Sequence, residues 1–226
     1  GPRRRGGNRR GGDGDGGAYQ PDPAKARKWF THARTAADSS NEEYALWCYA
    51  NGIRFDPEEM APHEEMYAAA VRFMSKGGKP APRSEIRKLD GPHPVEHFAA
   101  AEFAWMRELR SATAALRVLD AAGKDQLHEF GRWISPKVVN NLSHQKTASP
   151  RDLRKAMKLM GNVAAWDHAI GCGEIALSLD PADGELQAEL KNFAAQRAMD
   201  QGGYAESAGE EGGYRKFIRD ADKQRE

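Results

Sequence analysis

Apolar residues recur at steps of three and four between Pro150 and Pro181, which is the spacing of one face of an α-helix. The first run stops at Gly161-Asn162, a pair suited to a helix end and a tight turn. A second run begins at Trp166 and stops at Asp180-Pro181. The two faces consist of Leu153, Ala156, Met157 and Met160, and then of Trp166, Ala169, Ile170, Gly173, Ala176 and Leu177. This pattern predicts a helical hairpin whose broad apolar surface needs a neighbouring helix.

The same pattern occurs in residues 26–57. Aligning Pro57 with Pro181 places Ala45 opposite Ala169, and it also pairs the two cysteines with each other. Both segments resemble the tetratricopeptide repeat, a helix–turn–helix unit with anchors of the pattern Trp…Leu-Gly…Tyr…Ala…Phe…Ala…Pro. The anchors fall on Trp29, His32-Ala33, Ala36, Ala45, Tyr49, Gly52 and Pro57 in the first copy, and on Leu153, Ala156-Met157, Met160, Ala169, Gly173, Ala176 and Pro181 in the second. Neither copy has the Leu-Gly pair or a tyrosine at the third anchor.

From these patterns we predict an all-α fold of helix–turn–helix repeats, a tetratricopeptide-like α-solenoid or superhelix, with a disordered Gly/Arg-rich N-terminal arm. The predicted segments are the arm (1–22), an N-terminal hairpin with a following helix (23–76), a Pro/Gly-rich linker (77–94), a divergent helical segment (95–148), a C-terminal hairpin with a capping helix (149–201) and a flexible charged tail with a short helix (202–226). The linker is the expected boundary between two subdomains, because it holds two adjacent glycines and several prolines.

Cap residues and apolar stripes predict the helices of these segments. Asp22-Pro23 suits the start of the first helix, and Ser40 or Asn41 suits the start of the second. Further helices are expected over 58–76, over 95–123 as one long stripe, and over 124–134, where Ser135-Pro136 closes the helix. Small residues in the last hairpin would let another helix approach closely, and residues 183–200 have the amphipathic pattern of a helix that caps an array.

Composition narrows the class of protein. The chain has 226 residues, a net charge of +1 and 30% charged residues, so its overall charge calls for neither nucleic acid nor an acidic membrane. Two cysteines cannot form a disulfide framework, and no apolar run reaches the roughly 20 residues that span a bilayer. With no signal peptide, we expect a cytoplasmic protein and no membrane partner. Because the chain begins Gly1-Pro2 and ends within a charged, helix-like pattern, we also expect a segment of a longer protein.

Residues 1–17 hold glycine, arginine and aspartate with almost no apolar side chain, so they cannot fold alone. One interpretation is an arm that contacts RNA phosphates and stacks guanidinium groups on bases. The other is a flexible linker that its arginines keep soluble. Asp13 and Asp15 cancel part of the positive charge, and no aromatic residue is interleaved before Tyr19.

One motif has the spacing of a zinc site, because His93-Pro94-Val95-Glu96-His97 fits H-x-x-E-H, a metalloprotease signature. That chemistry needs both histidines inside a helix, whereas the flanking prolines place His93 at a helix start. We therefore predict a cap at His93, Pro94 at the first helical position and Glu96 beside the helix dipole. No catalytic residue, metal or cofactor is expected elsewhere, since both cysteines lie among apolar residues and no phosphate-binding loop is present.

A binding surface remains as the expected functional feature. The tetratricopeptide resemblance implies that the first helix of each repeat lines a concave groove for peptides or helices. By position this groove would present Arg27, Phe30, Arg34 and Ala37 from the first copy, and Arg151, Arg154, Lys158 and Gly161 from the second. Five of those eight residues are cationic. We therefore expect a non-enzymatic protein–protein interaction scaffold with an acidic partner. The alternatives are an ordinary solvated helix face, or an RNA-associated protein that uses the 1–17 arm.

Overall fold

The computed structural model describes residues 17–144 and 149–202, and this part of the chain is helical throughout, without a strand. The helices are α1 (Pro23–Asp38), α2 (Glu42–Ile53), α3 (Met60–Ser75), α4 (Arg83–Leu89), α5 (Pro94–Met106), α6 (Ala112–Lys124), α7 (His128–His144), α8 (Pro150–Asn162) and α9 (Trp166–Leu179), followed by a helix over 184–202. The all-α prediction is thus confirmed. Among these helices, none combines the length and the apolar character that crossing a membrane requires.

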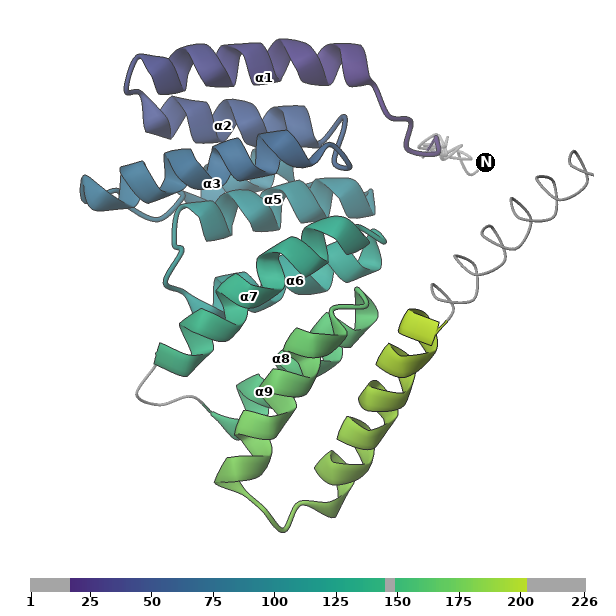
Figure 1. Ribbon diagram of the computed structural model, residues 1–226. Helices are drawn as coiled ribbons and strands as arrows, with labels where there is room; N and C mark the ends of the chain where they lie inside the picture. Colours follow the sequence, from purple (N-terminus) through teal and green to yellow (C-terminus); the bar gives the residue numbers. More distant parts are fainter. Residues whose placement is uncertain (1–16, 145–148, 203–226) are drawn as a thin grey trace, which may run out of the picture.

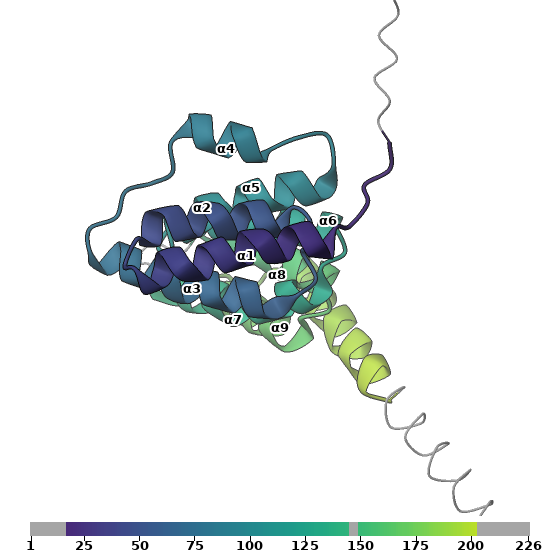
Figure 2. The same cartoon turned by 90° about the horizontal axis from the view of Figure 1, so that it is seen from above.

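The helices stack side by side from α1 at one end to the 184–202 helix at the other (Figure 1). The pairs α1–α2, α5–α6 and α8–α9 pack as neighbours along the chain. Seen from above, α2, α5 and α6 lie on one side of the stack, whereas α3, α7 and α9 lie on the other (Figure 2). Contacts of α2 with α5, of α3 with α7, and of α7 with α9 join consecutive pairs into one body.

Both predicted hairpins are present, and short polar side chains start both helices of the first one as expected. The Asp22 carboxylate accepts a hydrogen bond from the backbone N–H of Lys25 at 3.0 Å, and Pro23 occupies the first turn of α1. The Asn41 side chain accepts from the N–H of Tyr44 at 3.3 Å and so caps α2. These caps satisfy backbone groups that have no partner inside the helix. Of the predicted N-terminal arm, residues 1–16 lie outside the described residues, as does the predicted tail helix.

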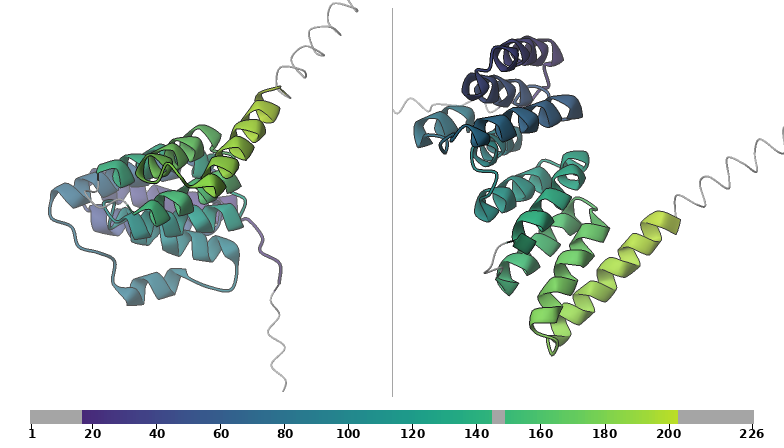
Figure 3. Two further views of the ribbon diagram at one scale, coloured as in Figure 1. Left: turned by 90° about the horizontal axis from the view of Figure 1, so that it is seen from below. Right: turned by 60° about the vertical axis from the view of Figure 1, so that its left-hand side comes forward.

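The 184–202 helix packs on the α8–α9 hairpin and confirms the predicted neighbour (Figure 3). A β-carbon placed on Gly173 would lie 2.4 Å from Leu190 Cδ2, and one on Gly161 would lie 2.3 Å from Phe193 Cε1. Two glycines of the hairpin thus give the helix its close approach, as the small residues indicated. The Trp166 indole N–H donates to Asp200 near the other end of the interface.

The predicted linker over 77–94 contains α4, which differs from the sequence interpretation. This short helix lies outside the stack beside α5, and its Leu89 side chain is buried (Figure 2). Arg107 holds the segment in place, because its Nε–H donates to the Lys79 carbonyl at 2.9 Å. The guanidinium is only 3% exposed and lies 4.5 Å from the centre of the Phe73 ring. A buried arginine thus anchors the 77–94 segment to the end of α5.

The long stripe over 95–123 is divided into α5 and α6, so the prediction of a single helix is wrong. The chain turns between Arg107 and Ser111, and the Ser111 hydroxyl accepts from the Ala114 N–H at 3.2 Å. Ser111 is therefore an N-cap inside a continuous apolar pattern. The break lets α6 fold back on α5, so that the apolar residues of the two helices pack against each other.

Pro136 does not end a helix as predicted, because it lies inside α7. Proline there has no N–H to donate to the carbonyl one turn earlier, a loss that disfavours helix interiors. The buried side chains of Ile134, Val138 and Leu142 continue across the proline and pack into the core. Burial of each of these side chains stabilises the folded state by about 1.5–3 kcal/mol, and together they outweigh the backbone hydrogen bond that Pro136 cannot donate.

Replacing Pro136 with Ala should raise the free energy of unfolding by up to about 3 kcal/mol, because alanine restores the missing hydrogen bond and suits helix interiors. The proline side chain is exposed, so its removal creates no cavity. Urea denaturation measures the change. The matched control is Pro94→Ala at the first turn of α5, where proline is well placed and no gain is expected. Equal or lower stability of the Pro136 variant would contradict this account of α7.

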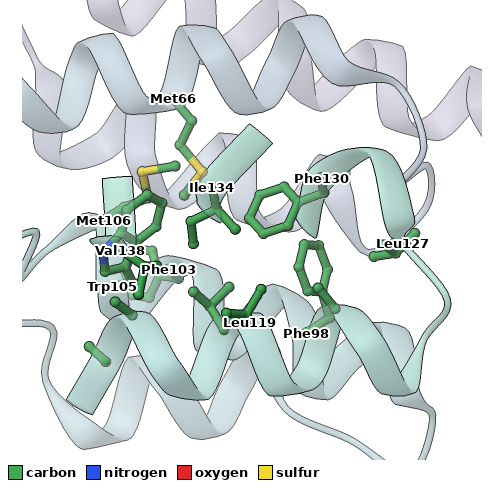
Figure 4. Packing of buried hydrophobic residues seen from close by; sticks show 14 of the residues in the cluster. Met66, Phe98, Phe103, Trp105, Met106, Leu119, Leu127, Phe130, Ile134 and Val138 are labelled. Atoms are coloured by element: carbon green, nitrogen blue, oxygen red, sulfur yellow. The ribbon is translucent and has the colours of Figure 1, made fainter. Parts of the chain in front are cut away.

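The core runs without interruption through the stack, across the expected subdomain boundary. Figure 4 shows its centre, where side chains of α3, α5, α6 and α7 meet. The Phe98 and Phe130 rings lie edge to face, with 4.8 Å between their centroids. Phe130 also approaches the Trp133 ring at 5.5 Å. Trp133 in turn lies edge-on to the Tyr67 ring of α3 at 5.8 Å, so aromatic contacts join residues on both sides of the 77–94 segment, and edge contacts of this kind add to the effect of burial.

A buried polar pair lies beside these rings. The Nδ1 atom of His63 is 2.6 Å from Glu102 Oε1, and its Nε2 atom is 2.8 Å from the Pro57 carbonyl oxygen. Both side chains are fully buried. Because each ring nitrogen faces an acceptor, the protonated imidazole is the form that donates both bonds. The pair therefore forms a charged link between α3 and α5 inside the apolar core.

Candidate binding surfaces

Three of the predicted site residues line one surface pocket. Arg151, Arg154 and Lys158 project from α8 into a cavity of about 680 Å³, together with Lys155. We call this cavity the α8 pocket, and it is completed by Pro150, Leu159, Ala176, Asp180, Asp183 and Leu186. Successive helical turns of α8 place its four cations on one side of the helix. The pocket thus combines an apolar base with an excess of positive charge.

Arg154 is already engaged by the chain itself. Its Nη1–H donates to Asp183 Oδ2 at 2.8 Å, and its Nη2–H donates to Glu189 Oε1 at 3.1 Å. Glu185 lies 3.4 Å from the same guanidinium. These carboxylates belong to the start of the 184–202 helix and the residue before it. Arg154 therefore holds this helix against α8, and the fork of its guanidinium suits a pair of carboxylates.

The other cations of the pocket are more available to a ligand. Arg151 and Lys155 are exposed, and neither has an ion pair in the part of the chain that the structure describes. Lys158 is 60% exposed, and its Nζ atom lies 3.9 Å from Glu189, the outer limit of an ion pair. The free positive charge of the α8 pocket thus lies mainly on the first turns of α8.

The predicted residues of the first copy lie elsewhere. α1 is at the opposite end of the stack from α8, so the two groups do not form one cationic stripe (Figure 1). Arg34 makes a two-point contact with Glu65 of α3, at 2.9 Å from Nε and 3.2 Å from Nη2. Phe30 is 1% exposed and packs against the backbone of Gly52, which makes it unavailable to a ligand. Arg27 is exposed on α1.

The zinc-like motif forms a helix start, as predicted. His93 is the N-cap of α5, Pro94 is in its first turn, and a Glu96 oxygen accepts from the His93 N–H at 3.1 Å. The other Glu96 oxygen pairs with Arg54 at 3.1 Å, so this carboxylate is not directed at a water or metal. His97 pairs with Asp90. In 17–144 and 149–202, no three His, Cys, Asp or Glu side chains gather in a way that would hold a metal ion.

The two cysteines lie in the core, at matching positions of α2 and α9. Burial raises the pKa of the Cys172 thiol to about 11. A thiol with a raised pKa is a weak nucleophile, since the thiolate is the reactive form. Both residues therefore behave as small apolar side chains, which agrees with the sequence interpretation.

A second pocket was missed by the sequence analysis. It has a volume of about 460 Å³ and lies where α3, α5, α7 and the turn after α5 meet, lined by Tyr67, Trp105, Leu109, Arg110, Lys137, Asn140, Asn141 and His144. We call it the α7 pocket. Its residues come from three separate segments, and none of them belongs to a local motif. The only sequence signal is the group of polar residues at 137, 140, 141 and 144, which one face of a helix would bring together.

Comparison of the sequence with protein-family models and with curated proteins returns no match in either case. The geometry of the two pockets is therefore the basis for assigning a function.

Proposed function

We propose that this chain is a tetratricopeptide-like helical scaffold that binds an acidic peptide or helix in the α8 pocket and performs no chemistry itself. The observation that carries the proposal is the gathering of four cations of α8 around one cavity, of which Arg151 and Lys155 have no carboxylate partner in the described part of the chain. An acidic ligand would supply the missing counter-charges, and such complementarity favours both selectivity and rapid association.

The lining of the pocket suits a peptide better than a free ion. Leu159, Ala176 and Leu186 form an apolar base, on which a side chain of the ligand could be buried. The cations of α8 line one side of that base, so carboxylates flanking an apolar residue of the ligand would meet them there. The stacked helical pairs and the matching hairpins support a repeat-type scaffold, and such scaffolds present extended surfaces to partners. RNA contact through residues 1–17 stays a prediction, because these residues lie almost entirely outside the described part.

The test is the double substitution Arg151→Ala with Lys155→Ala. These side chains are exposed and unpaired within 17–144 and 149–202, so their loss should leave stability nearly unchanged. We expect the affinity for a fluorescent peptide of alternating Glu and Leu to fall about tenfold, which corresponds to roughly 1.4 kcal/mol. Fluorescence anisotropy at low and high salt measures the affinity, and the salt dependence should weaken in the variant.

The matched control removes the same charge from a different surface. Arg83 and Arg87 are exposed residues of α4, which lies outside the stack (Figure 2). The double variant Arg83→Ala with Arg87→Ala should bind the peptide as the parent chain does. If both double variants lose the same affinity, binding reflects overall charge and the α8 pocket is not the site. If the parent chain does not bind the peptide at all, the proposal fails.

A further inference from the structure

The α7 pocket has an aromatic wall. The Tyr67 and Trp105 rings are stacked, with 5.8 Å between centroids and 27° between planes. Trp133 stands edge-on to Tyr67 at 5.8 Å. Tyr67 and Trp105 line the pocket, and Trp133 of α7 does not line it but packs edge-on against both rings, so the wall is preformed in the folded chain. A preformed concave wall of aromatic side chains is the usual setting of a small-molecule site.

The polar lining of the pocket is made of donors. Arg110, Lys137, Asn140 and His144 contribute side chains that carry positive charge or N–H groups, and the lining includes no Asp or Glu. Lys137 is central to it, with its Nζ atom 4.8 Å from the Tyr67 ring centre and 4.5 Å from that of Trp133. The ammonium is therefore held over aromatic faces and partly withdrawn from water.

Lys137 differs from the other shielded cations of the protein. In the described residues, the remaining Lys and Arg side chains that are not fully exposed are Arg54, Arg107, Arg154 and Arg197, and each has a carboxylate within ion-pair distance. Lys137 has no such pair there. Burial lowers the pKa of its ammonium, and the charge of Glu64 opposes this effect only in part. A cation that is partly withdrawn from water and has no carboxylate within ion-pair distance favours the binding of an anionic ligand.

We propose that the α7 pocket binds the phosphate group of a small phosphate monoester. Lys137 and Arg110 neutralise the dianion, and the Asn140 amide donates a further hydrogen bond. The aromatic wall packs against the organic part of the ester. A phosphate is favoured over a carboxylate because its charge approaches −2 near neutral pH and so matches both Lys137 and Arg110, whereas a carboxylate carries a single negative charge.

Isothermal titration calorimetry with phenyl phosphate tests this site, with quenching of tryptophan fluorescence as a second readout from Trp105 and Trp133. The parent chain should bind, and both Lys137→Gln and Arg110→Gln should weaken binding at least about tenfold. Lys191→Gln is the control, because Lys191 is exposed on the 184–202 helix, far from the pocket. Circular dichroism confirms that each variant is folded.

Two further ligands, inorganic phosphate and benzoate, show which kind of anion the pocket binds. If inorganic phosphate binds as tightly as phenyl phosphate, the site is confirmed and its ligand is free phosphate. If phenyl phosphate binds more tightly, the ligand is an ester. Benzoate that binds as well as phenyl phosphate overturns the preference for phosphate, and binding that survives both pocket substitutions overturns the site. None of these results bears on peptide binding in the α8 pocket, because that proposal is tested with other variants and another ligand.

Discussion

Replacing Glu102 with Ala should lower the free energy of unfolding by about 3–5 kcal/mol, as measured by urea denaturation at pH 6. The substitution leaves the protonated His63 ring in the core without its counter-charge, and it also removes the acceptor of the 2.6 Å contact. Loss of one member of a buried charged pair is far more costly than loss of an exposed one, because water cannot replace the missing partner.

The same pair predicts how stability depends on pH. Burial lowers the pKa of His63, but the charge of Glu102 and the two hydrogen bonds outweigh it, so the folded pKa lies above the ordinary value of about 6.5. A raised folded pKa means that the stabilisation is complete below about pH 6.5 and is lost as the pH rises through the folded value. The Glu102 variant should lack this loss.

Two controls make the result specific. Glu174→Ala removes an exposed carboxylate of α9 and should change stability by less than about 0.5 kcal/mol. The double variant His63→Leu with Glu102→Leu replaces the whole pair by apolar side chains, a change that is often neutral. If Glu102→Ala costs no more than Glu174→Ala, the pair is not a charged link in the folded protein.

The Phe98→Ala substitution should lower the free energy of unfolding by about 3–5 kcal/mol, because it leaves a cavity among large side chains that cannot collapse into it. Phe98 is fully buried and contacts the rings of His63 and Phe130, so it joins α3, α5 and α7. Since the core is continuous across the 77–94 segment, thermal unfolding should remain one transition at a lower temperature.

Calorimetry and circular dichroism measure this transition. The control Tyr44→Ala removes an aromatic ring that is 49% exposed, and it should cost much less. Two separate transitions, of which Phe98→Ala shifts only one, would show that the chain unfolds as two subdomains. That outcome would support the boundary that the glycines and prolines of 77–94 suggested.

The two hairpins could be predicted from the sequence because their signals are local. All four helices have an apolar face, α1, α2 and α8 begin at a capping side chain, and a proline or glycine lies near the ends of α2, α8 and α9. The small residues of α9, Gly173 among them, also indicated correctly that another helix would pack closely, whereas Gly161 was predicted only as a helix end. In these segments, neighbouring residues determine both the element and its boundaries.

The middle of the chain could not be predicted in this way, since contacts between distant residues decide its structure. Ser111 caps α6 within a stripe that reads as one helix, and Pro136 is held inside α7 by the burial of its neighbours. The short α4 depends on Arg107, which lies beyond it in the chain. A pattern of apolar residues does not reveal that a charged side chain will be buried.

The same limit applies to the candidate site. The sequence identified Arg151, Arg154 and Lys158 as surface cations, and the α8 pocket brings them together. It could not show that Arg34 is paired with Glu65, because the two residues are on different helices. The α7 pocket was missed for a related reason, since its wall and its donors come from α3, α5, the turn after α5 and α7, which only the packed structure brings together.

The attachment of the 184–202 helix has a consequence for local opening. This helix stands at one end of the described stack and contributes Leu186 to the α8 pocket (Figure 1). It is held on α8 and α9 by the Arg154 ion pairs, the Arg197–Asp167 ion pair, the Trp166–Asp200 hydrogen bond and apolar contacts. Its amide hydrogens should therefore exchange with solvent before those of α5 or α7. When the helix detaches, the pocket loses one wall. A ligand of the pocket must then slow that exchange, and the slowing would report binding without any label on the ligand.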